Sequence, residues 1–243
     1  MSIEQFLENI TLEQLEEFKK IKELEVNKIP TFSFSTIKFN EISKLVKINK
    51  CFNFDKFNKW FDNKIEIDLN TVHFLQALID DNIFLIDSYK EEDLKVKFLT
   101  PILNKIKFLN FDNNLRDFYN EKLIYKTDKF ILNGETDFMV AKGLIEGEKP
   151  YFFIQEFKKG KTNSDPEPQL ISAVELNNWD TIKGAYIVGA IWNFVILERI
   201  EKHKYQYYVS INFDSTKIDD LKDIYKNLMF IKNEIIEMVK NEN

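Results

Sequence analysis

Hydrophobic residues recur at helical spacing in several parts of the chain and at strand spacing between them. The strongest helical pattern covers residues 90–106, where apolar side chains return every three or four positions. Pro101 lies inside this pattern and predicts a kink or local break, because proline lacks a backbone donor and its ring crowds the preceding turn. A charged helix beginning with a capping box is expected over residues 11–27, and an amphipathic helix over residues 218–240.

Short runs of β-branched and aromatic residues follow the helix of 90–106 and indicate strands. These runs are 123–125, 129–132, 136–141, 151–158, 184–191, 194–200 and 205–211, with further short helices expected at 54–63, 71–79 and 168–178. The order is helices, a strand meander, one crossover helix, more strands and a last helix. It predicts an α/β fold, a mixed sheet with helices packed on it. Residues 1–88 are expected as a mostly helical N-terminal extension, and residues 89–243 as the core.

Composition narrows the chemistry that the chain can carry. Cys51 is the single cysteine and there are two histidines, so a cysteine-based zinc site, a disulfide and a histidine-rich metal site are all disfavoured. The net charge is −6, with 40 acidic residues, so chemistry has to come mainly from Asp, Glu, Lys and amide groups. The first residues do not resemble a secretory signal and no apolar run is long enough to span a bilayer. A cytoplasmic location without membrane association is expected.

Acidic residues occur inside two of the predicted strands. Strand alternation places Glu135, Asp137 and Met139 on one face. Glu156 and Lys158 share a face directly after the apolar run 151–154. Charged groups at the end of a buried strand are costly unless they are paired or bind a ligand. These positions are therefore candidates for a functional site.

The helix of 90–106 supplies a third candidate segment. At about 100° per residue, Glu91 projects into the apolar arc of this helix. Lys95 follows four residues later, falls inside the same arc and can pair with Glu91. An acidic residue near the start of a helix is also favoured by the helix dipole alone, so the functional and the structural interpretation of Glu91 are about even.

These residue types are typical of a divalent-metal site. Carboxylate oxygens suit Mg²⁺ or Mn²⁺, and Mg²⁺ usually takes one or two protein carboxylates together with water and phosphate oxygens. Asp137 and Glu156 on adjacent strands are expected to hold the ion, with the Phe157 carbonyl as a further ligand. Lys158 would then orient or help to deprotonate an attacking water, or stabilise developing negative charge.

The pattern of Asp137, a gap of eighteen residues and then Glu156-Phe157-Lys158 resembles the PD-(D/E)XK nuclease superfamily. The segment KEEDLKVKFLTPIL is similar to the opening helix of the nuclease domain of type I restriction subunits. The segments GETDFMVAKG and KPYFFIQEFKKGK resemble a group of uncharacterised bacterial proteins with the same core. The resemblance covers roughly residues 90–211. It implies a restriction-endonuclease-like sheet and Mg²⁺-dependent cleavage of DNA, with Mn²⁺ as a substitute ion.

The same resemblance implies a role for individual residues. Asp137 and Glu156 match the metal ligands, Lys158 the catalytic lysine, Glu91 the acid of the preceding helix, and Gln169 the glutamine of the helix after the catalytic strand. The chain departs from the pattern by having Thr136 where a proline often precedes the aspartate. It also has Ala173 where RecB-like exonucleases carry a tyrosine, which makes that subgroup less favoured.

Several alternatives stay open on sequence grounds. Lys159 and Lys161 extend a basic run that either contacts phosphate or forms a solvated turn. A non-catalytic nucleic-acid-binding or regulatory module on the same fold is the main rival to a nuclease, because the chain is acidic and contains two arginines in all. A glycosidase with two carboxylates is disfavoured, since it leaves the lysine without a role. RNA as a substrate and a homodimer are both compatible with the sequence.

Overall fold

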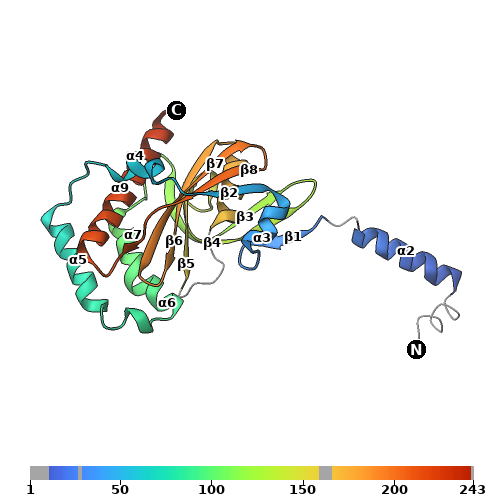
Figure 1. Ribbon diagram of the computed structural model, residues 1–243, viewed down its shortest axis with the longest axis horizontal. Helices are drawn as coiled ribbons and strands as arrows, with labels where there is room; N and C mark the ends of the chain where they lie inside the picture. Colours follow the sequence, from blue (N-terminus) through green and yellow to red (C-terminus); the bar gives the residue numbers. More distant parts are fainter. Residues whose placement is uncertain (1–10, 27–28, 159–165, 242–243) are drawn as a thin grey trace.

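The computed structural model describes residues 11–26, 29–158 and 166–241. Its centre is a mixed sheet with strand order β1-β4-β5-β6-β7-β8-β2, in which β3 also pairs with β4 and β9 with β7 (Figure 1). Helices flank the sheet, and one further helix lies at the N-terminal end of the described chain. The predicted α/β class with a mixed sheet and flanking helices is confirmed.

The strands are longer and more numerous than the sequence pattern indicates. They are β1 (Thr31–Ser33), β2 (Lys47–Cys51), β3 (Leu115–Lys126), β4 (Ile131–Lys142), β5 (Glu148–Lys158), β6 (Thr181–Val188), β7 (Ile191–Glu201), β8 (Lys204–Val209) and β9 (Phe213–Asp214). The two strands expected at 129–132 and 136–141 are one strand, β4. Gly134, which suggests a turn, instead allows close packing: a Cβ atom there would lie 2.7 Å from the Phe34 ring.

The helical segments follow the predicted pattern closely. They are α2 (Leu12–Val26), α3 (Phe39–Leu45), η1 (Phe54–Phe57), α4 (Asn58–Phe61), α5 (Leu69–Asn82), η2 (Ile86–Ser88), α6 (Glu91–Leu94), η3 (Lys95–Leu99), α7 (Thr100–Ile106), α8 (Glu167–Asn177) and α9 (Ile218–Asn241). The capping box at the start of α2 is present, because the Thr11 and Gln14 side chains each accept the other's backbone N–H, at 3.2 and 3.0 Å. None of the helices in the described ranges is long and apolar enough to cross a membrane.

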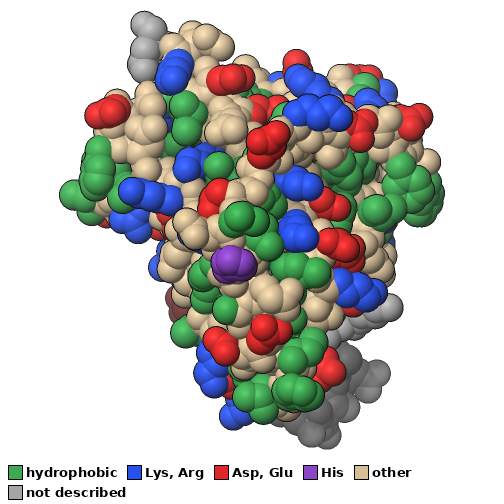
Figure 2. Space-filling model, turned by 90° about the vertical axis from the view of Figure 1, so that its left-hand side faces the viewer, with side chains coloured by type: hydrophobic (Ala, Val, Ile, Leu, Met, Phe, Trp, Pro, Cys, Tyr) green, Lys and Arg blue, Asp and Glu red, His purple; other side chains and the backbone are tan. Residues whose placement is uncertain are grey.

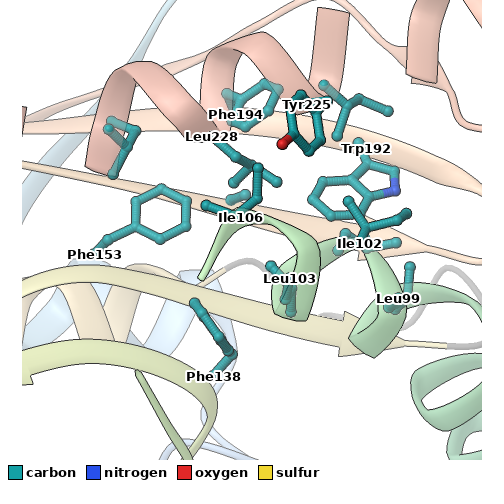
Figure 3. Packing of buried hydrophobic residues seen from close by; sticks show 14 of the residues in the cluster. Leu99, Ile102, Leu103, Ile106, Phe138, Phe153, Trp192, Phe194, Tyr225 and Leu228 are labelled. Atoms are coloured by element: carbon teal, nitrogen blue, oxygen red, sulfur yellow. The ribbon is translucent and has the colours of Figure 1, made fainter. Parts of the chain in front are cut away.

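One face of the sheet is covered by α4, α5, α7 and α9 (Figure 1). Apolar side chains of these helices pack against Phe138, Phe153 and Trp192 of the sheet, and we call this cluster the α7–α9 core (Figure 3). The outer surface of this layer mixes Lys and Arg with Asp, Glu and apolar side chains (Figure 2). Burial of these large apolar side chains is the main force that fixes the helices to the sheet.

The predicted break at Pro101 takes the form of a widened helical turn. Residues of η3 form a π-helical turn between α6 and α7, and Pro101 stands in the first turn of α7. Widening the turn before a proline relieves the clash between its ring and the preceding carbonyl groups. The consequence is that α6, η3 and α7 continue as one helical segment past the proline.

The other face of the sheet curls around α8. Buried residues of α8 pack against strands from β1 to β8, and we call this cluster the α8 core. The helix contacts β3, β4, β5, β6 and β7. The Tyr125 hydroxyl at the end of β3 lies 2.7 Å from Nε2 of His203, in the turn between β7 and β8, which brings distant parts of the curled sheet together.

Most of the regular structure in residues 29–88 is helical, as the sequence predicts, but this segment also supplies two strands to the sheet. Strands β1 and β2 belong to the sheet, with β1 beside β4 and β2 beside β8. Phe57, Trp60 and Leu75 are buried in the α7–α9 core. Both strands are short, so the sequence gives little alternation by which to detect them.

Candidate active site

The predicted acidic residues meet where β4 and β5 stop pairing. The paired part of these antiparallel strands ends with Phe138 opposite Gln155, so Asp137 and Glu156 are the next opposing positions. Opposing residues of an antiparallel pair project from the same face. Strand alternation puts both carboxylates on the α8 side, since their neighbours Met139 and Ile154 belong to the α8 core.

Each of these carboxylates accepts a backbone donor from the opposite strand. The Asp137 N–H donates to Glu156 Oε1 at 3.4 Å, and the Phe157 N–H donates to Asp137 Oδ2 at 2.8 Å. The side chains therefore replace main-chain pairing at this point of the sheet. Glu156 is 5% exposed and the Asp137 side chain 18% exposed, so two like charges are held close together with little water around them.

Lys95 of η3 supplies a positive charge to this acidic pair. Its Nζ lies 3.7 Å from Asp137 Oδ1, donates to Asn120 Oδ1 at 3.0 Å and stands over the Phe157 ring. Lys95 is 7% exposed, and a buried ammonium is stable only beside such partners. The sequence places Lys95 on the inward arc of its helix, but pairs it with Glu91 and not with the sheet.

Glu91 stands at the start of α6 and is half-buried. The described residues hold no group of three or more His, Cys, Asp or Glu side chains suited to a metal ion. Glu91 is therefore not part of a three-carboxylate group with Asp137 and Glu156 among the described residues, and its predicted role as a ligand stays a prediction. Glu135, the other acid on β4, is exposed.

The donor set of the acidic pair fits a hard divalent cation. Both side chains are carboxylates, and each has a second oxygen besides the one that accepts a backbone N–H. Mg²⁺ and Mn²⁺ prefer such oxygens and commonly use one or two of them, with water completing the coordination. The Phe157 carbonyl, the other predicted ligand, belongs to the residue whose N–H contacts Asp137.

The predicted lysines lie at or beyond the limit of the described residues. The Lys158 backbone ends β5 and pairs with Val188 of β6, two residues after Glu156. Its side chain, and Lys159 and Lys161 entirely, lie outside the described residues. Their predicted roles therefore stay predictions.

Helix α8 brings a second group of polar residues to the same end of the sheet. Gln169 lies in its first turn, is 4% exposed, and its Oε1 has no hydrogen-bond partner among the described residues. Glu167, also buried, lies 3.1 Å from Nζ of Lys50 at the end of β2. A buried amide oxygen without a partner is costly and rare in folded proteins, which makes Gln169 a candidate ligand contact.

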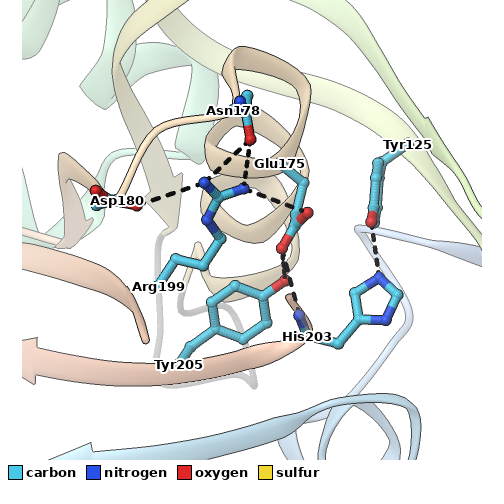
Figure 4. A network of polar contacts seen from close by, with 7 residues as sticks. All are labelled: Tyr125, Glu175, Asn178, Asp180, Arg199, His203 and Tyr205. Atoms are coloured by element: carbon cyan, nitrogen blue, oxygen red, sulfur yellow. Dashed lines mark hydrogen bonds and ion pairs between the residues drawn. The ribbon is translucent and has the colours of Figure 1, made fainter. Parts of the chain in front are cut away.

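The opposite end of α8 holds a polar network that sequence reasoning missed (Figure 4). Glu175 Oε1 accepts the Tyr205 hydroxyl at 2.6 Å, and its Oε2 lies 3.7 Å from the Arg199 guanidinium. Arg199 also donates two hydrogen bonds to Asn178 Oδ1, both 3.1 Å long. Burial and the nearby Glu175 carboxylate raise the pKa of Tyr205, so its hydroxyl stays a donor. The one feature of the sequence that could have drawn attention to this network is Arg199, because the chain contains just two arginines.

No protein-family model matches the chain, and no curated protein matches it either. The arguments about function therefore rest on the residues and their geometry.

Proposed function

We propose that this protein is a divalent-metal-dependent nuclease that hydrolyses phosphodiester bonds of DNA. The observation that carries the proposal is the meeting of Asp137 and Glu156 at the point where β4 and β5 separate. Two mostly buried carboxylates on one face are unfavourable for folding unless a cation neutralises them. The resemblance of these residues to the PD-(D/E)XK pattern agrees with this choice of chemistry.

Asp137 and Glu156 would hold Mg²⁺ or Mn²⁺ and so fix the position of a scissile phosphate. A bound metal of this kind polarises the phosphoryl group and lowers the pKa of a coordinated water. Lys158 follows Glu156 by two positions in the sequence, the spacing on which its predicted role as the catalytic lysine depends. Its proposed role is to orient the attacking water and to balance negative charge.

Two buried residues would support this centre from opposite sides of the sheet. Lys95 balances the charge of Asp137 from the helical layer. Gln169 offers an amide oxygen from the first turn of α8, on the face of β5 that carries Glu156. Its proposed role is to hold the substrate or a metal-bound water, which would satisfy the amide oxygen.

The test is cleavage of labelled DNA in Mg²⁺ or Mn²⁺, with RNA as a second substrate. Glu156→Gln and Lys158→Ala should each reduce the cleavage rate by about a hundredfold or more, the scale expected when a group that stabilises transition-state charge is lost. Glu135→Gln is the matched control, because it removes one exposed carboxylate from the same strand and should cleave normally. A wild-type protein that cuts neither substrate would refute the nuclease proposal.

A non-catalytic nucleic-acid-binding module is the second candidate. The observation that favours it is the contact of Lys95 with Asp137, because an ammonium can partly balance the acidic pair without a metal. This alternative predicts that the wild-type protein binds nucleic acid, binds no Mn²⁺ and leaves all substrates intact. Mn²⁺ binding followed by cleavage would exclude it.

A further inference from the structure

Two exposed phenylalanines lie at the same end of the sheet as the acidic pair. Strands β5, β6, β8 and β2 all run in one direction, so the end of β2 lies at the sheet end where β5 finishes. Directly after β2, Phe52 is 93% exposed and Phe54 is 56% exposed. Single exposed apolar residues are common on protein surfaces, but two aromatic rings separated by one residue form a small apolar platform.

The chain around this platform is basic, although the whole protein is acidic. Residues 29–59 contain six lysines and two acids, a net charge of +4 in a chain whose total is −6. All six lysines are exposed: Lys38, Lys44, Lys47, Lys50, Lys56 and Lys59. The remaining residues therefore carry −10. Lys50 and Lys56 are ion-paired with Glu167 and Glu198 from outside this segment, so its other lysines supply the positive charge that would attract an anionic partner.

The platform is connected to the acidic pair through α8. Lys50, two residues before Phe52, lies 3.1 Å from Glu167 in the first turn of α8. Gln169, whose buried Oε1 has no hydrogen-bond partner in the described part of the chain, follows two residues later in the same turn. Four strand spacings of about 4.8 Å separate β2 from β5, so the span along a flat sheet is about 20 Å, and the curl of this sheet shortens it.

We propose that Phe52 and Phe54, with the lysines around them, bind a single-stranded segment of nucleic acid and lead it to the acidic pair. Bases stack on the two rings while lysines contact the phosphates. This inference rests on the proposed nuclease function and specifies its substrate class. Single strands are favoured because exposed rings can stack on unpaired bases, whereas the bases of a duplex already stack on one another. A strand of four or more nucleotides is long enough for the span.

The experiment is fluorescence anisotropy with a labelled twelve-nucleotide oligo-dT in EDTA, where cleavage does not occur. The double variant Phe52→Ala/Phe54→Ala should bind about tenfold or more weakly, because stacking on each ring contributes to affinity. The control is Phe84→Ala/Phe111→Ala, which removes two rings that are 94% and 71% exposed elsewhere and should bind like wild type. A twelve-base-pair duplex should bind more weakly than oligo-dT.

Salt dependence separates phosphate contacts from stacking. Lys38→Gln/Lys59→Gln should flatten the plot of log affinity against log salt, by about 0.7 per lysine that contacts phosphate. The phenylalanine variant should keep the wild-type slope and lose affinity at every salt concentration. Equal binding by wild type and the phenylalanine variant, or preference for the duplex, would overturn the proposal. So would binding to anionic lipid vesicles with no affinity for oligo-dT.

The outcome for this surface is distinguishable from the outcome for the nuclease. Wild type that binds oligo-dT but never cuts would support the platform and refute the nuclease. Wild type that cuts duplex DNA but does not bind oligo-dT would refute the platform and support the nuclease.

Discussion

The two ends of α8 both contain buried acids, but their surroundings differ. At the C-terminal end, Glu175 has a tyrosine hydroxyl and a guanidinium as partners, and Arg199 is further held by Asn178 and Asp180. At the N-terminal end, the Glu156 and Asp137 carboxylates stand together, and the nearby Gln169 oxygen has no partner among the described residues. The first arrangement pairs its buried acid with a guanidinium and a hydroxyl, whereas the second brings two carboxylates together beside Lys95 and is the proposed cation site.

The groove in the structure lies at the end of α8 opposite to the proposed site. A groove of about 1160 Å³ lies beside Glu175 and Arg199, at the C-terminal end. Its most buried charged residues already have protein partners, so a ligand there would have to compete with them. If the proposed function is right, the buried Gln169 oxygen, which has no partner among the described residues, indicates the site better than the size of the groove does.

The largest effect on stability is expected at the C-terminal end of α8, where Glu175 has its partners. Glu175→Ala should lower the free energy of unfolding by about 3 kcal/mol, because it leaves the buried Tyr205 hydroxyl and the Arg199 guanidinium with fewer partners. Urea denaturation measures this change. The control Glu201→Ala removes an exposed acid paired with Lys204 and should cost less than about 1 kcal/mol. Similar losses in both variants would contradict a structural role for this network.

Loss of a charge at the acidic end should have a different effect. Glu156→Gln keeps an oxygen that accepts the Asp137 N–H and removes repulsion between the two carboxylates. We expect the free energy of unfolding without metal to stay constant or to rise by about 1 kcal/mol, while cleavage is lost. A fall of more than about 2 kcal/mol would show that Glu156 is held for stability.

Gln169 allows a similar test within α8. Gln169→Met has nearly the same shape and removes the unpartnered oxygen, so unfolding should require about 1 kcal/mol more free energy while cleavage slows. Ser172→Ala is the control on the same helix, because the Ser172 hydroxyl donates to the Pro168 carbonyl at 2.7 Å. That variant should lose about 1 kcal/mol of stability and keep its activity. Destabilisation by Gln169→Met would contradict the claim that the buried Gln169 oxygen is unfavourable for folding.

The smallest expected effect is a pH dependence of the free energy of unfolding, caused by His203 near the C-terminal end of α8. Burial lowers the pKa of His203 below its usual 6.5, so the folded protein takes up this proton less readily than the unfolded chain. The stability linked to His203 is complete above pH 6.5 and declines as the pH falls from there through the lowered folded-state pKa. His203→Asn suits the positive φ of this residue, 61°, and should flatten that part of the profile. If urea titrations from pH 5 to 8 give the same stability profile for His203→Asn and wild type, His203 does not cause the pH dependence.

Much of the fold is readable from the sequence because buried faces repeat along regular elements. The helical pattern of 90–106, the crossover helix and the strands around Asp137 and Glu156 are all visible in this way. β2 is not, because its sequence KINKC buries a single residue, Ile48, and exposes lysines, as edge strands often do. The prediction of a helical segment up to residue 88 omits β1 and β2 for the same reason.

The candidate site is readable in part. Asp137 and Glu156 stand out because charged residues interrupt apolar strands, a local signal. The contact of Lys95 with Asp137 depends on how a helix packs on the sheet, and sequence spacing favours the nearer partner, Glu91. The network around Glu175 joins residues up to 80 positions apart without a motif, so it emerges only from the folded chain.

The measurement that tests the central claim most directly is calorimetric titration of metal-free protein with Mn²⁺. The account predicts saturable binding to the wild type and to Glu135→Gln, and loss of that binding in Glu156→Gln and Asp137→Asn. Binding that is absent from the wild type, or equally strong in Glu156→Gln, would contradict the claim that the acidic pair at the start of α8 is a metal site.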